Sequence, residues 1–154
     1  MIVSLTKAQR EELQAVLERT GAHREADKIE KVLPEDYIKY QSLVERKEFV
    51  FDVPSVNVSV KCYITTALNK SEHCPVHVNM HGGGFVYLQD EDDDRYCAHV
   101  AAGIRGIVVD IDYASSLEHA FPVALEQRYE VVRQVYYSCR EWGGDPEKLS
   151  TGGH

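Results

Sequence analysis

A chain of 154 residues is long enough for one domain with a core, and 44% hydrophobic and 27% charged residues are typical of globular proteins. The formal net charge of −8 argues against a nucleic-acid or anionic-membrane partner, because both require a basic face. The apolar runs are too short to span a membrane, and the N-terminus lacks the pattern of a signal peptide. We therefore expect a cytoplasmic protein whose cysteines, which show no CxxC spacing, are reduced thiols.

Residues 1–45 are highly charged and helical in pattern. Thr6 and Gln9 can form a capping box for a first helix. The apolar stripe of this helix consists of Leu13, Val16 and Leu17, and the helix ends at Gly21. A second short helix is expected over 23–31. A third begins at Pro34 and carries Tyr37, Tyr40 and Val44. None of these helices has enough apolar surface to fold alone, so we expect them to lie on the rest of the protein.

The hydrophobic period changes after residue 47. Two runs alternate between apolar and polar residues, namely Phe49, Phe51 and Val53 in the first and Val58, Val60, Cys62 and Ile64 in the second. This alternation predicts two adjacent antiparallel strands joined by a turn near Pro54–Asn57.

Strands and helices alternate in the remaining sequence. We expect a strand over Pro75–Met80, then a helix that is capped by Asp92–Asp94 and ends at Gly103, and then a strand over Gly106–Asp112. A second helix is expected from Pro122 to about Trp142, and a last strand begins at Lys148–Thr151. One face of the second helix carries Leu125, Tyr129, Val132 and Tyr136. Alternating units of this kind predict an α/β fold with a mainly parallel sheet covered by helices on both sides.

Three consecutive glycines follow the predicted strand at 75–80, in the run His81-Gly82-Gly83-Gly84-Phe85. Glycines at a strand end cost conformational entropy, but they permit positive φ and a close approach of a ligand to the main chain. Their N–H groups can converge on one point, which suits an oxyanion or a phosphate. A phosphate-binding loop would carry GxGxxG or Gly-Lys-Ser/Thr, and neither is present. A plain tight loop is the alternative interpretation.

Two further motifs follow predicted strands. Asp112-Tyr113 leads into the run Glu118-His119-Ala120-Phe121-Pro122, and the sequence ends with Ser150-Thr151-Gly152-Gly153-His154. A strand ending in glycine precedes the nucleophile in a G-x-S-x-G elbow, where small residues relieve crowding at a sharp turn. Gly153 and His154 would be the first two positions of such an elbow.

Together, HGGGF, DY…EHAFP and GGDPEKLS…GGH resemble the hormone-sensitive-lipase-like family of α/β-hydrolase-fold esterases in order and spacing. The resemblance implies the α/β-hydrolase fold, with residues 46–154 as the N-terminal half of the core and residues 1–45 as a helical cap or lid segment. The segment DYASSLEHAFP departs from the family's usual DYRLAPEHPFP at Ala114, Leu117 and Ala120. These departures concern the packing of the loop and not the class of reaction.

The resemblance also implies roles for the glycine loop. The backbone N–H groups of Gly83 and Gly84 would bind the oxyanion of a tetrahedral intermediate, Gly82 would shape the turn, and His81 would brace the loop. Glu118 and His119 match an E-H pair that we interpret as structural support beneath the site. The expected activity is that of a carboxylic ester hydrolase, acting on short-chain acyl or acetyl esters through a serine acyl-enzyme.

The catalytic triad itself is expected beyond residue 154. The nucleophile would be the next residue, and the acid and base would follow later, since this fold orders them Ser, Asp/Glu, His. A modified nucleophile, proteolysis at the elbow and a true truncation are three explanations for an end at His154. We favour the first two.

We expect a small-molecule ester as the binding partner, with no cofactor and no metal. The sequence is compatible with a homodimer. His73, Cys74 and His77 do not have the arrangement of a zinc site, and the acidic run Asp90–Asp94 lacks the spacing and glycine of a calcium loop. Cys97 and Cys139 are expected to be small core residues, and Tyr136, Tyr137 and Trp142 core and rim aromatics. The rival functions are a non-catalytic protein that binds a small carboxylate, and an interaction module.

Overall fold

The computed structural model describes residues 7–8, 11–12, 15 and 34–153. The capping box at Thr6 and Gln9, the stripe from Leu13 to Leu17 and the helix at 23–31 fall on residues outside these ranges. Within the described ranges, no helix has both the length and the apolar character needed to cross a bilayer.

The described chain alternates between strands and helices as the sequence predicts. The elements are α3 (Pro34–Gln41), β1 (Val44–Phe51), β2 (Val60–Ala67), β3 (Cys74–Met80), α4 (Glu91–Ile104), β4 (Ile107–Asp112), α5 (Val123–Ser138), the 3₁₀-helix η1 (Cys139–Trp142) and β5 (Gly144–Gly153).

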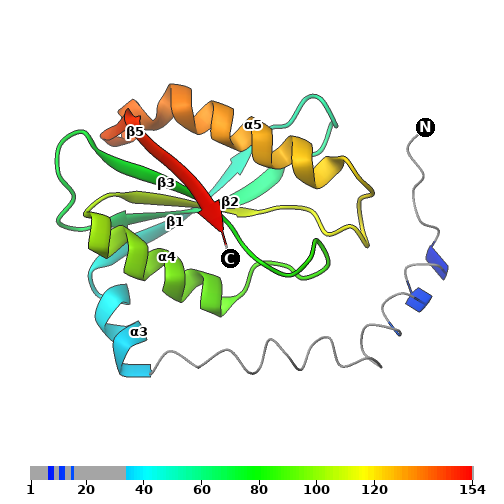
Figure 1. Ribbon diagram of the computed structural model, residues 1–154, viewed down its shortest axis with the longest axis horizontal. Coiled ribbons are helices and arrows are strands. Elements are labelled where there is room, and N and C mark those ends of the chain that lie inside the picture. The colour runs from blue at the N-terminus through cyan, green and yellow to red at the C-terminus, as the bar shows by residue number, and fades with distance from the viewer. Residues whose placement is uncertain (1–6, 9–10, 13–14, 16–33, 154) are drawn as a thin grey trace.

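The five strands form one sheet in the order β1-β2-β4-β3-β5. The β2 strand is antiparallel to both of its neighbours, β1 and β4, whereas β3 is parallel to both β4 and β5. Four strands therefore run in one direction and only β2 opposes them, which confirms the expected, mostly parallel sheet. The helices α4 and α5 lie on opposite faces of the sheet (Figure 1). The chain therefore leaves β3 along one face, through α4, and reaches β5 along the other face, through α5. This reversal makes β3 and β5 a topological switch point.

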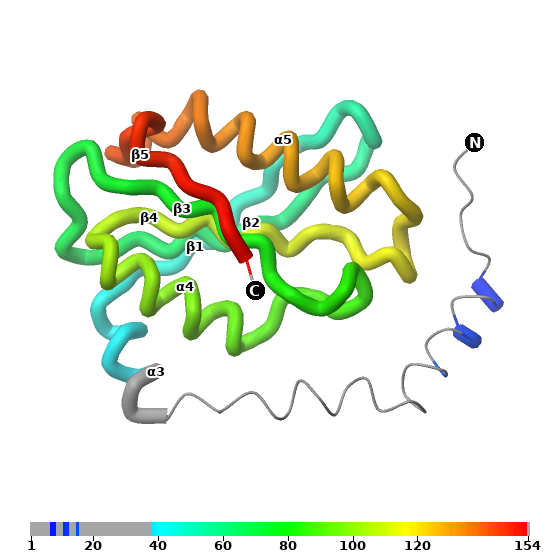
Figure 2. The backbone as a smooth tube through the Cα atoms, in the orientation of Figure 1, coloured from blue at the N-terminus to red at the C-terminus, as the bar shows by residue number. Residues whose placement is uncertain are grey.

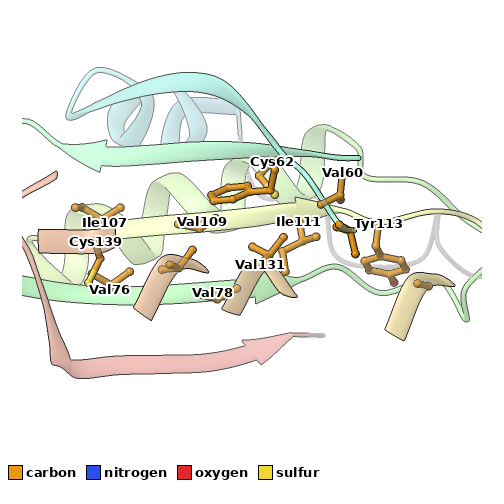
Figure 3. Close-up of a cluster of buried hydrophobic side chains, with 14 of the residues drawn as sticks. Val60, Cys62, Val76, Val78, Ile107, Val109, Ile111, Tyr113, Val131 and Cys139 are labelled. Atoms are coloured by element: carbon orange, nitrogen blue, oxygen red, sulfur yellow. The ribbon is translucent and has the colours of Figure 1, made fainter. Parts of the chain in front are cut away.

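The main hydrophobic core lies between the sheet and α5. Strand residues such as Val78, Val109 and Ile111 pack there against Val131 and Val135 of α5 (Figure 3). A smaller core on the opposite face holds Cys97 and Ala101 of α4 against Val108 of β4 (the tube in Figure 2 shows α4 along this face). All four cysteines are free and buried. Cys97 and Cys139 are core residues, as expected.

Several element ends differ from the sequence expectation. Asp90, not Asp92–Asp94, caps α4, since its side chain accepts from the N–H groups of Asp92 and Asp93. The helix ends at Arg105, in the left-handed conformation at φ 50°, and passes through Gly103. Val44 opens β1 and does not belong to a helix, and β5 begins at Gly144, before Asp145. The helix α5 gives way to η1 after Ser138.

The face of α5 that packs on the sheet is not the expected one. Its buried residues are Ala124, Gln127, Val131 and Val135. Of the expected stripe, Val132 is partly buried against this core, whereas Leu125, Tyr129 and Tyr136 are exposed, as is the neighbouring Tyr137 at 72%. Both stripes have helical spacing, and the smaller side chains occupy the buried one.

A buried polar pair interrupts the apolar layer beneath α4. Asn79 Nδ2 of β3 donates to Asp110 Oδ1 of β4 at 2.6 Å, and both side chains are at most 1% exposed. The pKa of Asp110 is raised from 3.8 to about 7, mainly by burial and in part by the charges of Asp93 and Asp94 of α4. The hydrogen bond from Asn79 and the charge of Arg46 act in the opposite direction. A carboxyl group with a raised pKa favours its protonated form in the folded state.

We predict that Asp110→Asn removes a pH dependence of stability. Because the pKa of Asp110 is raised in the folded state, its carboxyl group contributes its full stabilisation of the fold below pH 3.8. This contribution is lost as the pH rises to about 7. Between these pH values, the wild type should lose up to about 4 kcal/mol of unfolding free energy relative to the variant. Urea titrations at several pH values measure this, with Glu147→Gln, at an exposed position, as the control. Parallel curves for wild type and Asp110→Asn would contradict the prediction.

Candidate active site

The three sequence motifs meet at the carboxyl ends of β3, β4 and β5. The glycine loop follows Met80 at the end of β3, Tyr113 follows β4, and Gly153 is paired with Met80 at the end of β5. These ends enclose a cavity of about 330 Å³, lined by Met80, His81, Gly82, Gly83, Gly84, Phe85, Tyr113, Arg128 and Gly153. Ligands in open α/β sheets bind at this edge, beside the switch point.

The backbone of the glycine loop needs glycine at Gly83. Its φ is +107°, and a Cβ there would lie 2.6 Å from Tyr87 Cβ. Gly84 follows at φ +61° with open space where its Cβ would be, and Phe85 has φ +64°. The Gly83 carbonyl accepts hydrogen bonds from the N–H groups of Val86 and Tyr87 at 3.0 and 3.2 Å. The loop is thus a defined turn and not a plain flexible connection.

Tyr113 fixes the carbonyl groups at the start of the loop. Its hydroxyl donates to His81 O at 2.6 Å and lies 3.3 Å from Gly82 O. The Tyr113 side chain is 1% exposed, just past the end of β4 (Figure 3). Burial raises the pKa of Tyr113, so the hydroxyl keeps its proton and acts as a donor. The carbonyls of His81, Gly82 and Gly83 are therefore all engaged within the protein.

His81 holds the loop from the other side of the Tyr113 ring. The two rings are stacked, with centroids 4.0 Å apart and planes at 6°. Burial lowers the pKa of His81, so its imidazole is neutral at neutral pH. Its Nδ1 lies 2.8 Å from Gly82 O, and because a carbonyl can only accept, Nδ1 carries the proton. This geometry fits the bracing role expected for His81.

The N–H groups of Gly83 and Gly84 remain available to a ligand. Neither donates to a protein acceptor in the part of the chain that the structure describes. Both residues are exposed and line the cavity. Two adjacent amides with no internal acceptor, in a loop whose carbonyls are occupied, can stabilise negative charge on a ligand oxygen.

Arg128 of α5 is a lining residue that sequence reasoning missed. Its guanidinium carbon lies 3.7 Å from the ring centroid of Tyr113 and 4.5 Å from that of Phe85. His81 and Arg128 are both in contact with the Tyr113 ring, so they must occupy opposite faces of it. The sequence did contain a signal for this position: Arg128 lies four residues after Ala124 and three before Val131, so helical spacing places a charged residue within the buried stripe of α5.

The segment after Tyr113 supports the loop through backbone contacts. Ser115 Oγ donates to Val86 O at 3.1 Å, and Ser116 N donates to Phe85 O at 2.7 Å. The N–H groups of Glu118 and His119 both donate to Ser115 O, at 3.1 and 2.9 Å. Neither Glu118 nor His119 lines the cavity, and their role as support stays a prediction.

Gly153 and the end of β5 lie close against β3. A Cβ on Gly153 would lie 2.1 Å from Met80 O, so only glycine permits this approach. His154 is outside the described residues. Across those residues, no group of three or more histidine, cysteine or acidic side chains is placed to hold a metal ion.

A family model described as the alpha/beta hydrolase fold matches residues 77–154, which is half of the chain. The chain therefore belongs to the α/β-hydrolase family, in the hormone-sensitive-lipase-like branch that its motifs resemble.

Several relatives of this chain are named as esterases. Esterase LipI of Mycobacterium tuberculosis is 29% identical over 106 residues, which cover 69% of this chain and 33% of that protein. Versiconal hemiacetal acetate esterase of Dothistroma septosporum is 33% identical over 77 residues, covering 50% of this chain and 24% of that protein. The chain thus spans about a third or less of the length of these curated relatives.

Solved structures share the fold. A bacterial heroin esterase aligns with a TM-score of 0.70 at 23% identity, covering 99% of this chain and 45% of that one. An esterase of Pyrobaculum calidifontis aligns with a TM-score of 0.63 at 26% identity, covering 76% of this chain and 38% of that one.

We predict that Tyr113→Phe destabilises the fold and loosens the glycine loop. The substitution keeps the stacked ring but leaves the buried carbonyl of His81 without its donor, at a cost of about 1–3 kcal/mol. Urea denaturation measures the loss, and faster amide hydrogen exchange at residues 82–87 locates it. The control is Tyr129→Phe, at a position that is 65% exposed on α5. Equal stability of Tyr113→Phe and wild type would contradict the role of the hydroxyl.

Proposed function

We propose that this chain is part of a serine carboxylesterase that hydrolyses short-chain acyl esters, including acetyl esters. The observation that carries the proposal is the pair of available N–H groups at Gly83 and Gly84, two residues that line a cavity at the switch point of the sheet. The names of the relatives support ester hydrolysis, and one of them specifies an acetate ester. The cavity of about 330 Å³ suits a small acyl group.

The proposed reaction passes through a covalent intermediate. A serine hydroxyl, expected at the residue after His154, attacks the ester carbonyl carbon while a histidine base takes its proton. The carbonyl oxygen becomes an oxyanion that accepts hydrogen bonds from Gly83 and Gly84, which lowers the barrier. Collapse expels the alcohol, which takes the proton from the histidine, and leaves the acyl-enzyme. Water then releases the acid by the same steps. The acid and base of the triad are expected later in the chain.

The preformed loop explains how these residues would contribute to rate. The engaged carbonyls and the contacts of Tyr113 hold the amides in position before substrate arrives, so no reorganisation is needed as charge develops. Open space at the Cβ position of Gly84 leaves room for a ligand oxygen close to the main chain.

We also propose that residues 1–45 form a cap over the acyl pocket and limit acyl length, with residues 46–154 as the N-terminal half of the hydrolase core. Within this segment, α3 packs on α4, where Tyr40 stacks on His99 with ring centroids 4.5 Å apart, and Val44 already belongs to β1 of the sheet. The helix α3 adds no residue to the cavity lining. The proposal therefore concerns the residues before α3.

Deletion of residues 1–33 is expected to broaden the acyl-chain preference of the enzyme, because a cap that restricts the pocket and excludes water would be removed. Rates on p-nitrophenyl acetate, butyrate and octanoate measure the preference. An unchanged ratio of these rates in a folded deletion variant would contradict the cap.

The central experiment is labelling of the purified protein by a serine-directed fluorophosphonate. We expect one covalent adduct, located by peptide mapping on a serine that directly follows the sequence Gly152-Gly153-His154. Gly83→Ala should slow labelling by about 10²–10³-fold, because the new Cβ would displace the loop that holds the oxyanion donors. Absence of an adduct on the folded wild-type protein would overturn the proposal and favour a non-catalytic protein that binds carboxylates.

Gly103→Ala is the matched control for Gly83→Ala. A Cβ at Gly103, near the end of α4, meets nothing within 4 Å. Labelling should proceed at the wild-type rate, and stability should rise by about 0.5–1 kcal/mol, because alanine is the better helix former. Slowed labelling in both variants would show that the effect at Gly83 is not specific to the loop.

A further inference from the structure

The cavity beside the glycine loop holds one unpaired cation. Of the described residues that line it, Arg128 alone carries a formal charge, because burial lowers the pKa of His81 and keeps that ring neutral. The guanidinium packs on the rings of Tyr113 and Phe85, as described above. It therefore lies in the same cavity as the available N–H groups of Gly83 and Gly84.

The nearby carboxylates of α5 do not neutralise this charge. Glu130 forms its ion pair with Arg133 at 2.6 Å and also accepts from Gln134, and Glu126 accepts from Ser55 Oγ at 3.2 Å. In the described part of the chain, Arg128 forms no ion pair. Its Nε is buried and has no hydrogen-bond partner among the described residues. The charge of Arg128 is therefore not balanced by a carboxylate among the described residues.

Contacts with the rings of Tyr113 and Phe85 fix the guanidinium in place, and Arg128 also forms a hydrogen bond with the Tyr113 side chain, which acts to lower the pKa of that group. A cation over a ring face is attracted by the ring quadrupole, while its N–H groups stay in the plane of the guanidinium. The guanidinium is thus held in place by Tyr113 and Phe85, and its remaining N–H groups can donate to a carboxylate.

We propose that Arg128 is an anion subsite that selects esters carrying a second, ionised acid group, such as the monoesters of short dicarboxylic acids. The ester carbonyl would meet the N–H groups of Gly83 and Gly84, and the distal carboxylate would bind Arg128. The net charge of −8 disfavours anions over most of the protein surface, so a local cation is needed to admit one. The assignment of the ester carbonyl rests on the proposed function, whereas the binding of an anion at Arg128 does not.

The test compares two unreactive ligands of matched size on the purified protein. Succinamate carries one amide carbonyl and one carboxylate, and succinamide replaces the carboxylate with a neutral amide. We expect the wild type to bind succinamate about tenfold or more tightly than succinamide, by calorimetry or amide chemical shifts, since hydrogen bonds to charged groups are the stronger ones. Arg128→Gln should bring the ratio of the two dissociation constants near one.

Two further variants separate recognition from structural support. Arg128→Lys keeps the charge but not the fork, and should retain part of the preference. Arg133→Gln removes an ion-paired arginine on the same helix and should keep the full preference. Equal binding of the two ligands by wild type, or an equal loss of both in Arg128→Gln, would overturn the subsite.

The outcome is independent of the fluorophosphonate result. A preference for succinamate without a covalent adduct supports the subsite and rejects the esterase. An adduct without the preference rejects the subsite alone.

Discussion

The site depends on the contact between the Tyr113 hydroxyl and the carbonyl of His81, which ties the loop after β3 to the segment after β4. The same ring separates His81 from Arg128, so one side chain orders a carbonyl, an imidazole and a guanidinium at once. A buried hydroxyl that satisfies a buried carbonyl fixes direction as well as position. The orientation of the Gly83 and Gly84 amides follows, because their neighbouring carbonyls have no other freedom.

Sheet topology places these groups together. The parallel strands β3, β4 and β5 end at one edge, and helices α4 and α5 cover opposite faces, so loops from distant parts of the sequence converge there. Gly153 permits β5 to approach Met80 closely enough for its end to border the cavity. The backbone thus brings the glycine loop beside the position that the motif predicts for the nucleophile.

The molecule carries polar groups in its interior at a cost to stability. Asp110 and Asn79 lie in the layer under α4, where an apolar pair would pack without a desolvation penalty. Arg128 of α5 likewise places a charge at the border of the main core, on the face of the sheet opposite to α4. The buried Asp110 makes the stability of the fold depend on pH. Arg128 instead lines the cavity, where a ligand can bind to it.

The sequence by itself determined the strand and helix order, the glycine loop and the family, because hydrophobic period and motif spacing are local properties. The roles of His81 and Gly82–Gly84 followed from a resemblance, and they remain predictions that the geometry of the loop supports. Only the tertiary structure decided which face of α5 is buried, that Tyr113 holds the loop, and that Arg128 reaches the cavity. Those facts depend on how closely a helix approaches a sheet and on which side chains meet across strands far apart in sequence, and no periodicity within one segment encodes them.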